Sequence, residues 1–302
     1  MLFKELGKTG LQIPEVGIGT WNYHAGPEIL RKGLDAGALF IDTAESYGTE
    51  NVVAAALAGR RESVFLATKV SPPHFRRADV LKAADESLRS LRTNHIDLYQ
   101  LHEPNDKIPL EETLGAVETL VDAGKVRFVG VSNFSLAQLR LAQKAMRKYP
   151  IVSNQVRFNL IDRTISAELL PYCQLNGITV IAYSPLARGL HYILDCDSGG
   201  VLEEVAKTNN RTLLQTALNW CLCQDRVVVI PKGNSVEHVL ENCASSDWRL
   251  SPEQFCRLSE SISFQRRGRV DTLVRRLLSP SVKQGLKQFA RRLPPGLRRR
   301  FN

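Results

Sequence analysis

The chain has 302 residues, of which 43% are hydrophobic and 24% are charged, which is enough apolar material for a large core and an ordinary charge content for a soluble protein. Its formal net charge of +9 is uneven, because residues 266–302 hold 12 of the 40 Lys and Arg but one of the 31 Asp and Glu. The other residues nearly balance in charge, which excludes a body that binds nucleic acid across a whole face.

Three absences indicate where the protein works. The N-terminal MLFKELGKTG carries no apolar secretory signal, and no run of about 20 apolar residues is present to span a bilayer. The six cysteines form no CxxC pair, which favours reduced thiols. We therefore expect a cytoplasmic protein.

Short apolar strands and amphipathic helices alternate along the chain. It begins with a predicted β-hairpin, in which Phe3–Leu6 and Leu11–Ile13 flank Lys8-Thr9-Gly10. Eight further strands are predicted at Val16–Gly19, Leu39–Asp42, Val64–Lys69, Ile96–His102, Val126–Ser132, Ile151–Gln155, Thr179–Tyr183 and Val227–Ile230. Helices are predicted between them at Pro27–Ala36, Val52–Leu57, Ala78–Leu91, Leu110–Ala123, Ser135–Arg147, Ile165–Leu175, Leu213–Cys223 and Val236–Cys243.

This alternation predicts an α/β protein whose parallel strands close into a (β/α)8 TIM barrel over residues 1–263. A doubly wound open sheet is the main rival, but it usually has fewer strand–helix units. We expect the N-terminal hairpin to cover the bottom of the barrel. The segment Leu186–Gly200 is too long for a tight turn, so it is a candidate binding loop.

Residues 264–302 are predicted to form a basic amphipathic helical extension, interrupted at Pro280. Three interpretations remain open for it. The helices can fold back on the barrel with a solvated charged face, lie on an anionic membrane surface, or bind an acidic protein partner. Nucleic acid is disfavoured, because Phe289 and Phe301 are the only aromatic residues among residues 266–302. The oligomeric state is not indicated.

Reactive side chains fall at the carboxyl ends of three consecutive predicted strands. Asp42, Lys69 and His102 end the second, third and fourth barrel strands, and Tyr47 lies in the loop after the second. Each of these residues alone is most simply structural, as a cap, a packing residue or a strand end. Their convergence on the rim where barrel enzymes hold their chemistry favours an active site.

These residue types suit the reduction of a carbonyl group, which needs a hydride at carbon and a proton at oxygen. Tyr47 can donate the proton, and we expect the Lys69 cation to lower the phenol pKa from its ordinary value of about 10. Asp42 can keep Lys69 charged, and His102 can orient the substrate oxygen.

The motifs around these residues resemble those of the aldo-keto reductase family. They are Gly17-Ile-Gly-Thr-Trp21, Asp42-Thr-Ala-Glu-Ser-Tyr47-Gly48, Leu66-Ala-Thr-Lys69 and Asp97-Leu-Tyr-Gln-Leu-His102. The resemblance, which covers roughly residues 1–263, implies a catalytic tetrad of Asp42, Tyr47, Lys69 and His102. It also implies a substrate pocket that includes Trp21, Tyr47 and His102, with Tyr23 and His24 shaping it nearby. It implies no metal.

The same resemblance implies a nicotinamide dinucleotide site. Ser132, Asn133 and Gln155 would bind the carboxamide, Tyr183 would stack on the ring, and Ser184, Leu186 and Arg188 would line the pyrophosphate. The implied set also includes Gly19, Thr20, Trp21 and Asp42 and, for the adenosine and its 2′-phosphate, Lys232, Gly233, His238, Glu241 and Asn242. No GxGxxG turn is needed for this extended binding mode.

One departure bears on the choice of cofactor. Members that prefer NADPH usually place Ser or Thr and Arg at the positions of Gly233 and His238. Lys232 can still meet a phosphate as a point charge, but a bidentate guanidinium is absent. We therefore expect NADPH to be preferred with reduced selectivity, and NADH to remain usable.

The resemblance and the residues together predict an NADP-dependent reductase of the alcohol dehydrogenase [NAD(P)+] type, acting on a small aldehyde or ketone. A cofactor-sensing regulatory subunit with little turnover is the alternative, and an interaction tail is compatible with it. A Schiff-base aldolase that uses Lys69 is weaker, because it leaves the nicotinamide-binding residues unexplained.

Overall fold

The computed structural model describes residues 1–264. The helices expected over residues 266–302, and the membrane or acidic-partner contacts expected of them, lie outside the described residues. Within residues 1–264, every helix is too short or too polar to cross a membrane.

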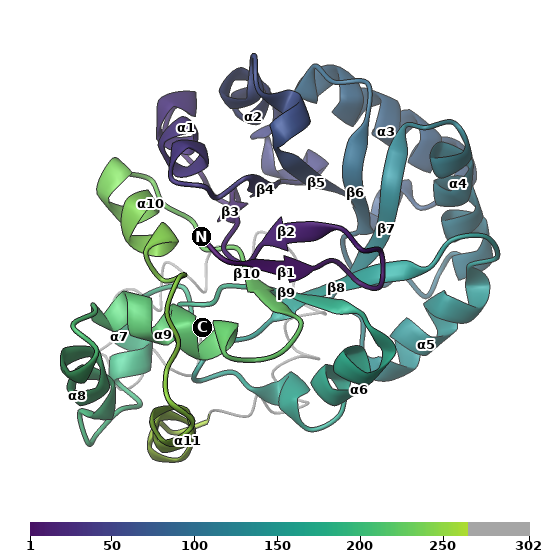
Figure 1. Ribbon diagram of the computed structural model, residues 1–302. Helices are drawn as coiled ribbons and strands as arrows, with labels where there is room; N and C mark the ends of the chain where they lie inside the picture. Colours follow the sequence, from purple (N-terminus) through teal and green to yellow (C-terminus); the bar gives the residue numbers. More distant parts are fainter. Residues whose placement is uncertain (265–302) are drawn as a thin grey trace, which may run out of the picture. The chain divides into compact units, whose positions relative to one another are not determined.

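Eight parallel strands form one sheet, in which neighbours in space are also neighbours in sequence. They are β3 (Ile18–Gly19), β4 (Phe40–Asp42), β5 (Phe65–Val70), β6 (Ile96–Leu101), β7 (Val126–Ser132), β8 (Ile151–Arg157), β9 (Thr179–Tyr183) and β10 (Val227–Val229). A parallel bridge between Val16 and Val229 joins the two ends of the sheet. The sheet thus closes into the predicted barrel (Figure 1).

The closure of the barrel explains why Gly19, in β3, is a glycine. The amide of Gly19 donates to the carbonyl oxygen of Pro231 at 3.1 Å. A Cβ atom at Gly19 would lie 2.6 Å from the carbonyl oxygen of Ile230. Any side chain there would force the two segments apart, so the barrel requires glycine at this position.

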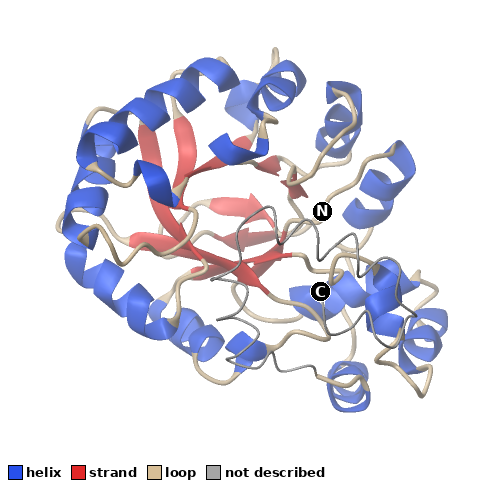
Figure 2. Ribbon diagram, turned by 180° about the vertical axis from the view of Figure 1, so that it is seen from behind, coloured by secondary structure: helices blue, strands red, loops and turns tan. Residues whose placement is uncertain are grey.

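Helices surround the sheet (Figure 2). The eight predicted ones are present as α1 (Pro27–Asp35), α2 (Glu50–Leu57), α3 (Arg77–Leu91), α4 (Leu110–Asp122), α5 (Leu136–Ala145), α6 (Leu169–Asn176), α9 (Leu213–Leu222) and α10 (Val236–Cys243). The prediction of α6 began four residues too early. Pro171 explains this, because a helix that started at Ile165 would carry Pro171 in its interior, where it has no amide to donate.

Three helices were not predicted: α7 (Leu190–Leu194), α8 (Val201–Thr208) and α11 (Pro252–Ser261). The first gives the expected loop of residues 186–200 a helical turn. The sequence carried a clear signal for α11, since Ser251 and Gln254 form a capping box and Pro252 occupies the first turn. For α8 the cap comes from Asp197, whose carboxylate accepts the first two helical amides at 2.9 and 2.8 Å.

The N-terminal hairpin covers one end of the barrel, as predicted. Its strands are β1 (Phe3–Glu5) and β2 (Gln12–Pro14), paired antiparallel. Leu6 and Ile13 are almost fully buried, and they pack with Phe40 and Phe65, which begin β4 and β5. Burial of each such aliphatic side chain contributes roughly 1.5–3 kcal/mol. The amino-terminal end of the barrel is therefore filled, and the carboxyl end is left for a site.

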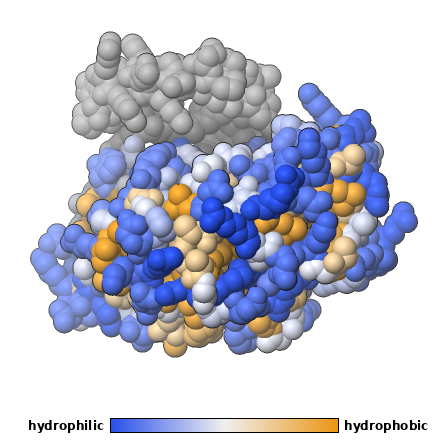
Figure 3. Space-filling model, turned by 90° about the horizontal axis from the view of Figure 1, so that it is seen from above, coloured by the Kyte–Doolittle hydropathy of each residue, from blue (hydrophilic) through white to orange (hydrophobic). Residues whose placement is uncertain are grey.

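The surface and the cysteines agree with the composition. On the face shown in Figure 3, hydrophilic side chains surround smaller hydrophobic groups. The six cysteines, which all lie within residues 1–264, form no disulfide with one another.

Candidate active site

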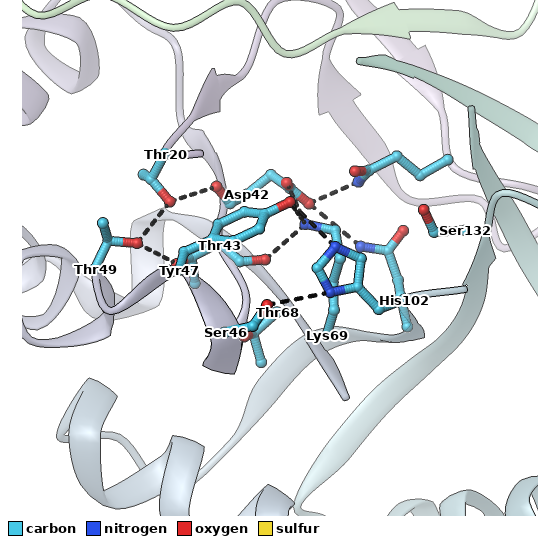
Figure 4. A network of polar contacts seen from close by, with 12 residues as sticks. Thr20, Asp42, Thr43, Ser46, Tyr47, Thr49, Thr68, Lys69, His102 and Ser132 are labelled. Carbon is cyan, nitrogen blue, oxygen red and sulfur yellow. Dashed lines mark hydrogen bonds and ion pairs between the residues drawn. The ribbon is translucent and has the colours of Figure 1, made fainter. Parts of the chain in front are cut away.

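The four side chains singled out in the sequence meet at the carboxyl end of the barrel (Figure 4). Asp42 is the last residue of β4, Lys69 lies next to the end of β5, and His102 directly follows β6. Tyr47 ends a 3-10 helix, η1 (Glu45–Tyr47), where the sequence predicted a loop. Because the strands are parallel neighbours, side chains far apart in sequence reach one place.

Lys69 and Asp42 form a buried ion pair. The ammonium nitrogen lies 2.6 Å from Oδ1 of Asp42 and 2.7 Å from the carbonyl oxygen of Thr43. Lys69 is fully buried, and Asp42 is 2% exposed. Burial lowers the pKa of Lys69, and the Asp42 carboxylate opposes that shift. The pair thus places the Lys69 cation inside the carboxyl end of the barrel, where the Asp42 carboxylate stabilises it.

The Tyr47 hydroxyl faces this cation. It lies 3.5 Å from the Lys69 nitrogen and 3.4 Å from Nε2 of His102. These contacts are long for hydrogen bonds, as is common at sites without a substrate. The phenol is therefore held next to two potential donors, with its oxygen at the rim.

The net shift of the Tyr47 pKa is upward, although the sequence led us to expect a lowering effect from Lys69. Burial, followed by the charges of Asp42 and Glu103, raises the pKa of Tyr47 instead of lowering it. Burial of the phenol is the largest cause of this rise. The Lys69 ammonium also lies closer to the Asp42 carboxylate, at 2.6 Å, than to the phenol oxygen, at 3.5 Å. The phenol is thus a fully protonated donor.

His102 is neutral at this position. Burial, and then the charge of Lys69, lowers its pKa to about 4. Its ring packs edge-on against Tyr47, with the ring centroids 5.4 Å apart. The imidazole can therefore donate a hydrogen bond through one nitrogen and accept one through the other.

This shift makes folding stability depend on pH. Because the unfolded histidine has a pKa near 6.5, the unfolded chain binds more protons than the folded one between about pH 4 and 6.5. Above about pH 6.5 the titration of His102 does not change the free energy of unfolding. As the pH drops from about 6.5 to about 4, it lowers this free energy by at most about 3 kcal/mol. Urea unfolding at several pH values in this range gives the free energy of unfolding at each pH. This free energy should change less steeply with pH in His102→Gln than in the original protein. His191→Gln, at an exposed position, should match the original. Equal slopes for His102→Gln and the original would contradict this.

The second carboxylate oxygen of Asp42 also has partners. Gln155 donates to Oδ2 at 2.8 Å and Gln100 donates to it at 3.3 Å. Gln155 was expected to meet a carboxamide, but in this structure its amide contacts Asp42. Sequence analysis missed Gln100, although a polar residue inside the apolar strand β6 was a visible signal.

A second layer of threonines supports the backbone of Asp42. Thr20 directly follows β3. It donates to the Asp42 carbonyl oxygen through both its amide and its hydroxyl, each at 3.0 Å. The Thr49 hydroxyl lies 3.0 Å from that of Thr20 and 2.9 Å from that of Thr43. Thr20 was predicted to touch a cofactor, and the structure shows it bracing the strand end.

The carboxamide candidates lie beside the tetrad. Ser132 ends β7 and accepts from the Asn133 side chain at 3.1 Å, and the same amide donates to the carbonyl oxygen of His102 at 3.1 Å. Tyr183 ends β9 and donates through its hydroxyl to Oδ1 of Asn133 at 2.9 Å. These groups and Gln155 occupy the ends of three consecutive strands.

The segment after β9 has an unusual backbone. Ser184, Ala187 and Arg188 have φ values of 48°, 55° and 72°, a left-handed conformation that non-glycine residues rarely adopt. Asn159, which is fully buried, donates to the carbonyl oxygen of Ser184 at 2.9 Å and fixes its start. Strain of this kind collects at binding sites, so the segment that includes Leu186 has the features of the predicted binding loop.

Two loops meet across this end of the barrel. The Arg188 guanidinium lies over the ring of Trp21, 5.3 Å from its centroid, and Trp21 is 49% exposed. His24, also exposed, contacts Asn234 through its amide at 3.4 Å. Tyr23 was expected to shape the pocket, and the structure shows where its side chain lies. It is 5% exposed, and its hydroxyl donates to the carbonyl oxygen of Gly26, so it packs beneath the rim.

The segment before α10 explains the departure at Gly233. A Cβ atom there would lie 2.5 Å from Cγ2 of Val239 and 2.9 Å from its backbone nitrogen. A serine or threonine is therefore excluded unless α10 moves. Lys232 and His238 are both exposed near the start of α10, and Ser235 caps that helix by accepting the amide of His238 at 3.2 Å.

Asn242 and Glu241 lie farther along the same helix. Asn242 is 5% exposed, and its Oδ1 has no hydrogen-bond partner among the described residues. A buried acceptor without a partner usually serves a ligand or a water molecule. Glu241 is partly exposed beside it. Within residues 1–264, no cluster of His, Cys, Asp and Glu is arranged to hold a metal.

Comparison with known proteins agrees with this geometry. The sequence profile described as "Aldo/keto reductase family" matches residues 15–263. Methylglyoxal reductase YeaE of Escherichia coli (strain K12) is 35% identical over 263 residues, which cover 83% of this chain and 92% of the relative. An aldo-keto reductase from Klebsiella pneumoniae, solved in complex with NADPH, is 36% identical with a TM-score of 0.82, covering 88% of this chain and 98% of that one. The thermostable aldo-keto reductase Tm1743 is 41% identical with a TM-score of 0.81, covering 86% and 99%.

Proposed function

The chain belongs to the aldo/keto reductase family, and on that premise we propose that it uses NADPH to reduce a small aldehyde or ketone to an alcohol. The observation that carries the proposal is the Tyr47 hydroxyl, held 3.5 Å from the Lys69 ammonium and 3.4 Å from the His102 imidazole at the open end of the barrel. A phenol in this position can give its proton to a carbonyl oxygen.

The residues of the chain fit a nicotinamide dinucleotide. The buried Oδ1 of Asn242 lacks a partner and suits the amino group of an adenine. The left-handed backbone of Ser184, Ala187 and Arg188 holds the loop after β9 in a costly shape, which suits a built ligand cradle. Ser132 and Asn133 bring hydroxyl and amide groups to the strand ends, of the kind that a carboxamide needs as partners. The nicotinamide supplies the hydride when it is bound.

The protein's own part in the reaction is to position and to protonate. Tyr47 donates its proton to the substrate oxygen as negative charge develops there. Lys69 stabilises the phenolate that remains, and Asp42 holds Lys69 in place. His102 donates a second hydrogen bond to the same oxygen, which fixes the carbonyl in front of the hydride. Trp21, exposed at the rim, lines the substrate side.

The proposed substrate is a small carbonyl compound. A relative with 35% identity is named as a methylglyoxal reductase, and this supports testing short aldehydes and dicarbonyls first. The aldolase alternative is weakened by Lys69 itself, because an amine held by Asp42 and the Thr43 carbonyl is an ammonium group and not a nucleophile. Enzyme names among the relatives support a reductase over a cofactor-sensing subunit.

A panel of aldehydes, ketones and dicarbonyls, followed by the absorbance of reduced cofactor, tests the proposal. We expect turnover with at least one short carbonyl compound. Tight binding of NADPH without turnover on the whole panel would favour the cofactor-sensing subunit.

Two exposed residues, His238 and Lys232, bear on the choice between NADPH and NADH. His238 stands where a guanidinium would meet a 2′-phosphate, so we expect His238→Arg to tighten NADPH binding about 10-fold, the value of one charge-assisted hydrogen bond. NADH binding should stay within about twofold, because NADH lacks that phosphate. Lys232→Gln is the matched opposite change and should weaken NADPH alone. Dissociation constants for both cofactors decide this, and parallel shifts for NADH would refute the assignment of the phosphate site.

A further inference from the structure

The two ring nitrogens of His102 have different neighbours (Figure 4). Nε2 lies 3.4 Å from the Tyr47 hydroxyl, and Nδ1 lies 3.5 Å from the hydroxyl of Ser46. Within residues 1–264, no other side chain hydrogen-bonds to Nδ1. Ser46 is the residue before Tyr47 on the 3-10 helix η1, so one short element supplies the neighbours of both nitrogens.

The backbone around His102 fixes where the ring stands. Its amide donates to the carbonyl oxygen of Val70 at 2.9 Å, and its carbonyl oxygen accepts from the Asn133 side chain at 3.1 Å. Tyr47 packs against the ring edge-on. These contacts set the position of the imidazole, but they do not determine which nitrogen carries its single proton.

That choice decides what the site can donate. With the proton on Nδ1, Nε2 would accept the phenol hydrogen of Tyr47 and hold it away from a substrate. With the proton on Nε2, His102 and Tyr47 can both donate to one carbonyl oxygen placed between them. Because the backbone contacts leave the choice open, the neighbour of Nδ1 decides between the two arrangements.

We propose that Ser46 is a positioning residue, whose hydroxyl donates to Nδ1 of His102 and thereby keeps the ring proton on Nε2. An unprotonated imidazole nitrogen is a better acceptor than a hydroxyl oxygen, so O–H···N is the stronger of the two possible pairings. The contact is long at 3.5 Å, and a substrate that bridges Tyr47 and His102 would tighten it. The value of this tautomer for catalysis rests on the proposed reductase function.

Nitrogen-15 spectroscopy of the histidine rings in the full cofactor-free chain tests this directly, with the His102 signals assigned by their loss in His102→Asn. We expect the original protein to show Nε2–H and an unprotonated Nδ1 shifted by hydrogen bonding. Ser46→Ala should remove that shift and increase the Nδ1–H form, and Ser46→Thr should restore the original pattern. Ser63→Ala is the matched control, since Ser63 is an exposed serine on another 3-10 helix, η2 (Arg61–Ser63).

Turnover gives a second readout. Ser46→Ala should lower kcat about threefold to tenfold, the effect of one neutral hydrogen bond, while KM changes less and Ser46→Thr recovers most of the rate. An Nδ1–H ring in the original protein, or the same tautomer populations in Ser46→Ala as in the original, would overturn the inference. Because the spectra need no turnover, they judge the role of Ser46 even where the proposed reductase function fails.

Discussion

Replacement of Tyr47 by phenylalanine should reduce the rate of carbonyl reduction by about 10²–10⁴-fold, the usual contribution of a positioned proton donor. The change removes one oxygen atom that lies within 3.5 Å of both the Lys69 ammonium and the His102 imidazole. Burial raises the pKa of Tyr47, so the phenol is protonated and the variant loses the proton that the original can donate. Initial rates with saturating NADPH measure the effect.

Binding of the cofactor separates this role from a structural one. Tyr47→Phe keeps the aromatic ring, so we expect NADPH to bind within about threefold of the original affinity. Lost turnover with preserved binding supports proton donation by Tyr47. A rate within tenfold of the original would mean that another group supplies the proton.

Replacing Asp42 by asparagine should destabilise the fold and also inactivate the enzyme. The change leaves the Lys69 ammonium fully buried without a carboxylate, and breaking one partner of a buried pair costs about 3–5 kcal/mol. Lys69→Met should have a comparable cost for the opposite reason, since it leaves the Asp42 charge unpaired. Urea unfolding of each full-length variant measures the free energy of unfolding.

The double variant Asp42→Asn with Lys69→Met distinguishes stability from chemistry. Without either charge, the free energy of unfolding should return to within about 2 kcal/mol of the original, because a neutral pair of similar volume is tolerated inside a protein. Activity should stay at least about 100-fold below the original, since no cation then stabilises the Tyr47 phenolate. Additive losses of stability in the double variant would show that the two side chains act independently, contrary to their 2.6 Å contact.

The barrel was predictable because its strands are buried on both faces. Runs such as Val126–Ser132 and Thr179–Tyr183 are apolar with few interruptions, and the structure gives both with the same bounds. The short helix α7 (Leu190–Leu194) was not predictable in this way. Five residues are too few to display a helical period, and its formation depends on packing that the sequence does not display.

The tetrad was predictable as a set of residue types at strand ends, but its electrostatics were not. The direction of the Tyr47 pKa shift depends on burial and on the nearby charges of Asp42 and Glu103, and both are properties of the folded barrel. The contacts of Gln100 and Gln155 with Asp42 likewise follow from the register of neighbouring strands. Gly233 is a third such case. From the sequence it is only the absence of a serine or threonine that could bind a phosphate, but in the structure glycine is required there because a Cβ atom would clash with Val239.

The most direct test follows the hydride itself. Reduced nicotinamide cofactor labelled with deuterium at the transferred position is mixed with the full chain and a short aldehyde or dicarbonyl, and the product is analysed by mass spectrometry. We expect one deuterium on the carbon of the new alcohol for each cofactor oxidised. Oxidation of the cofactor without labelled alcohol, or no oxidation across the carbonyl panel, would contradict a reductase at this site.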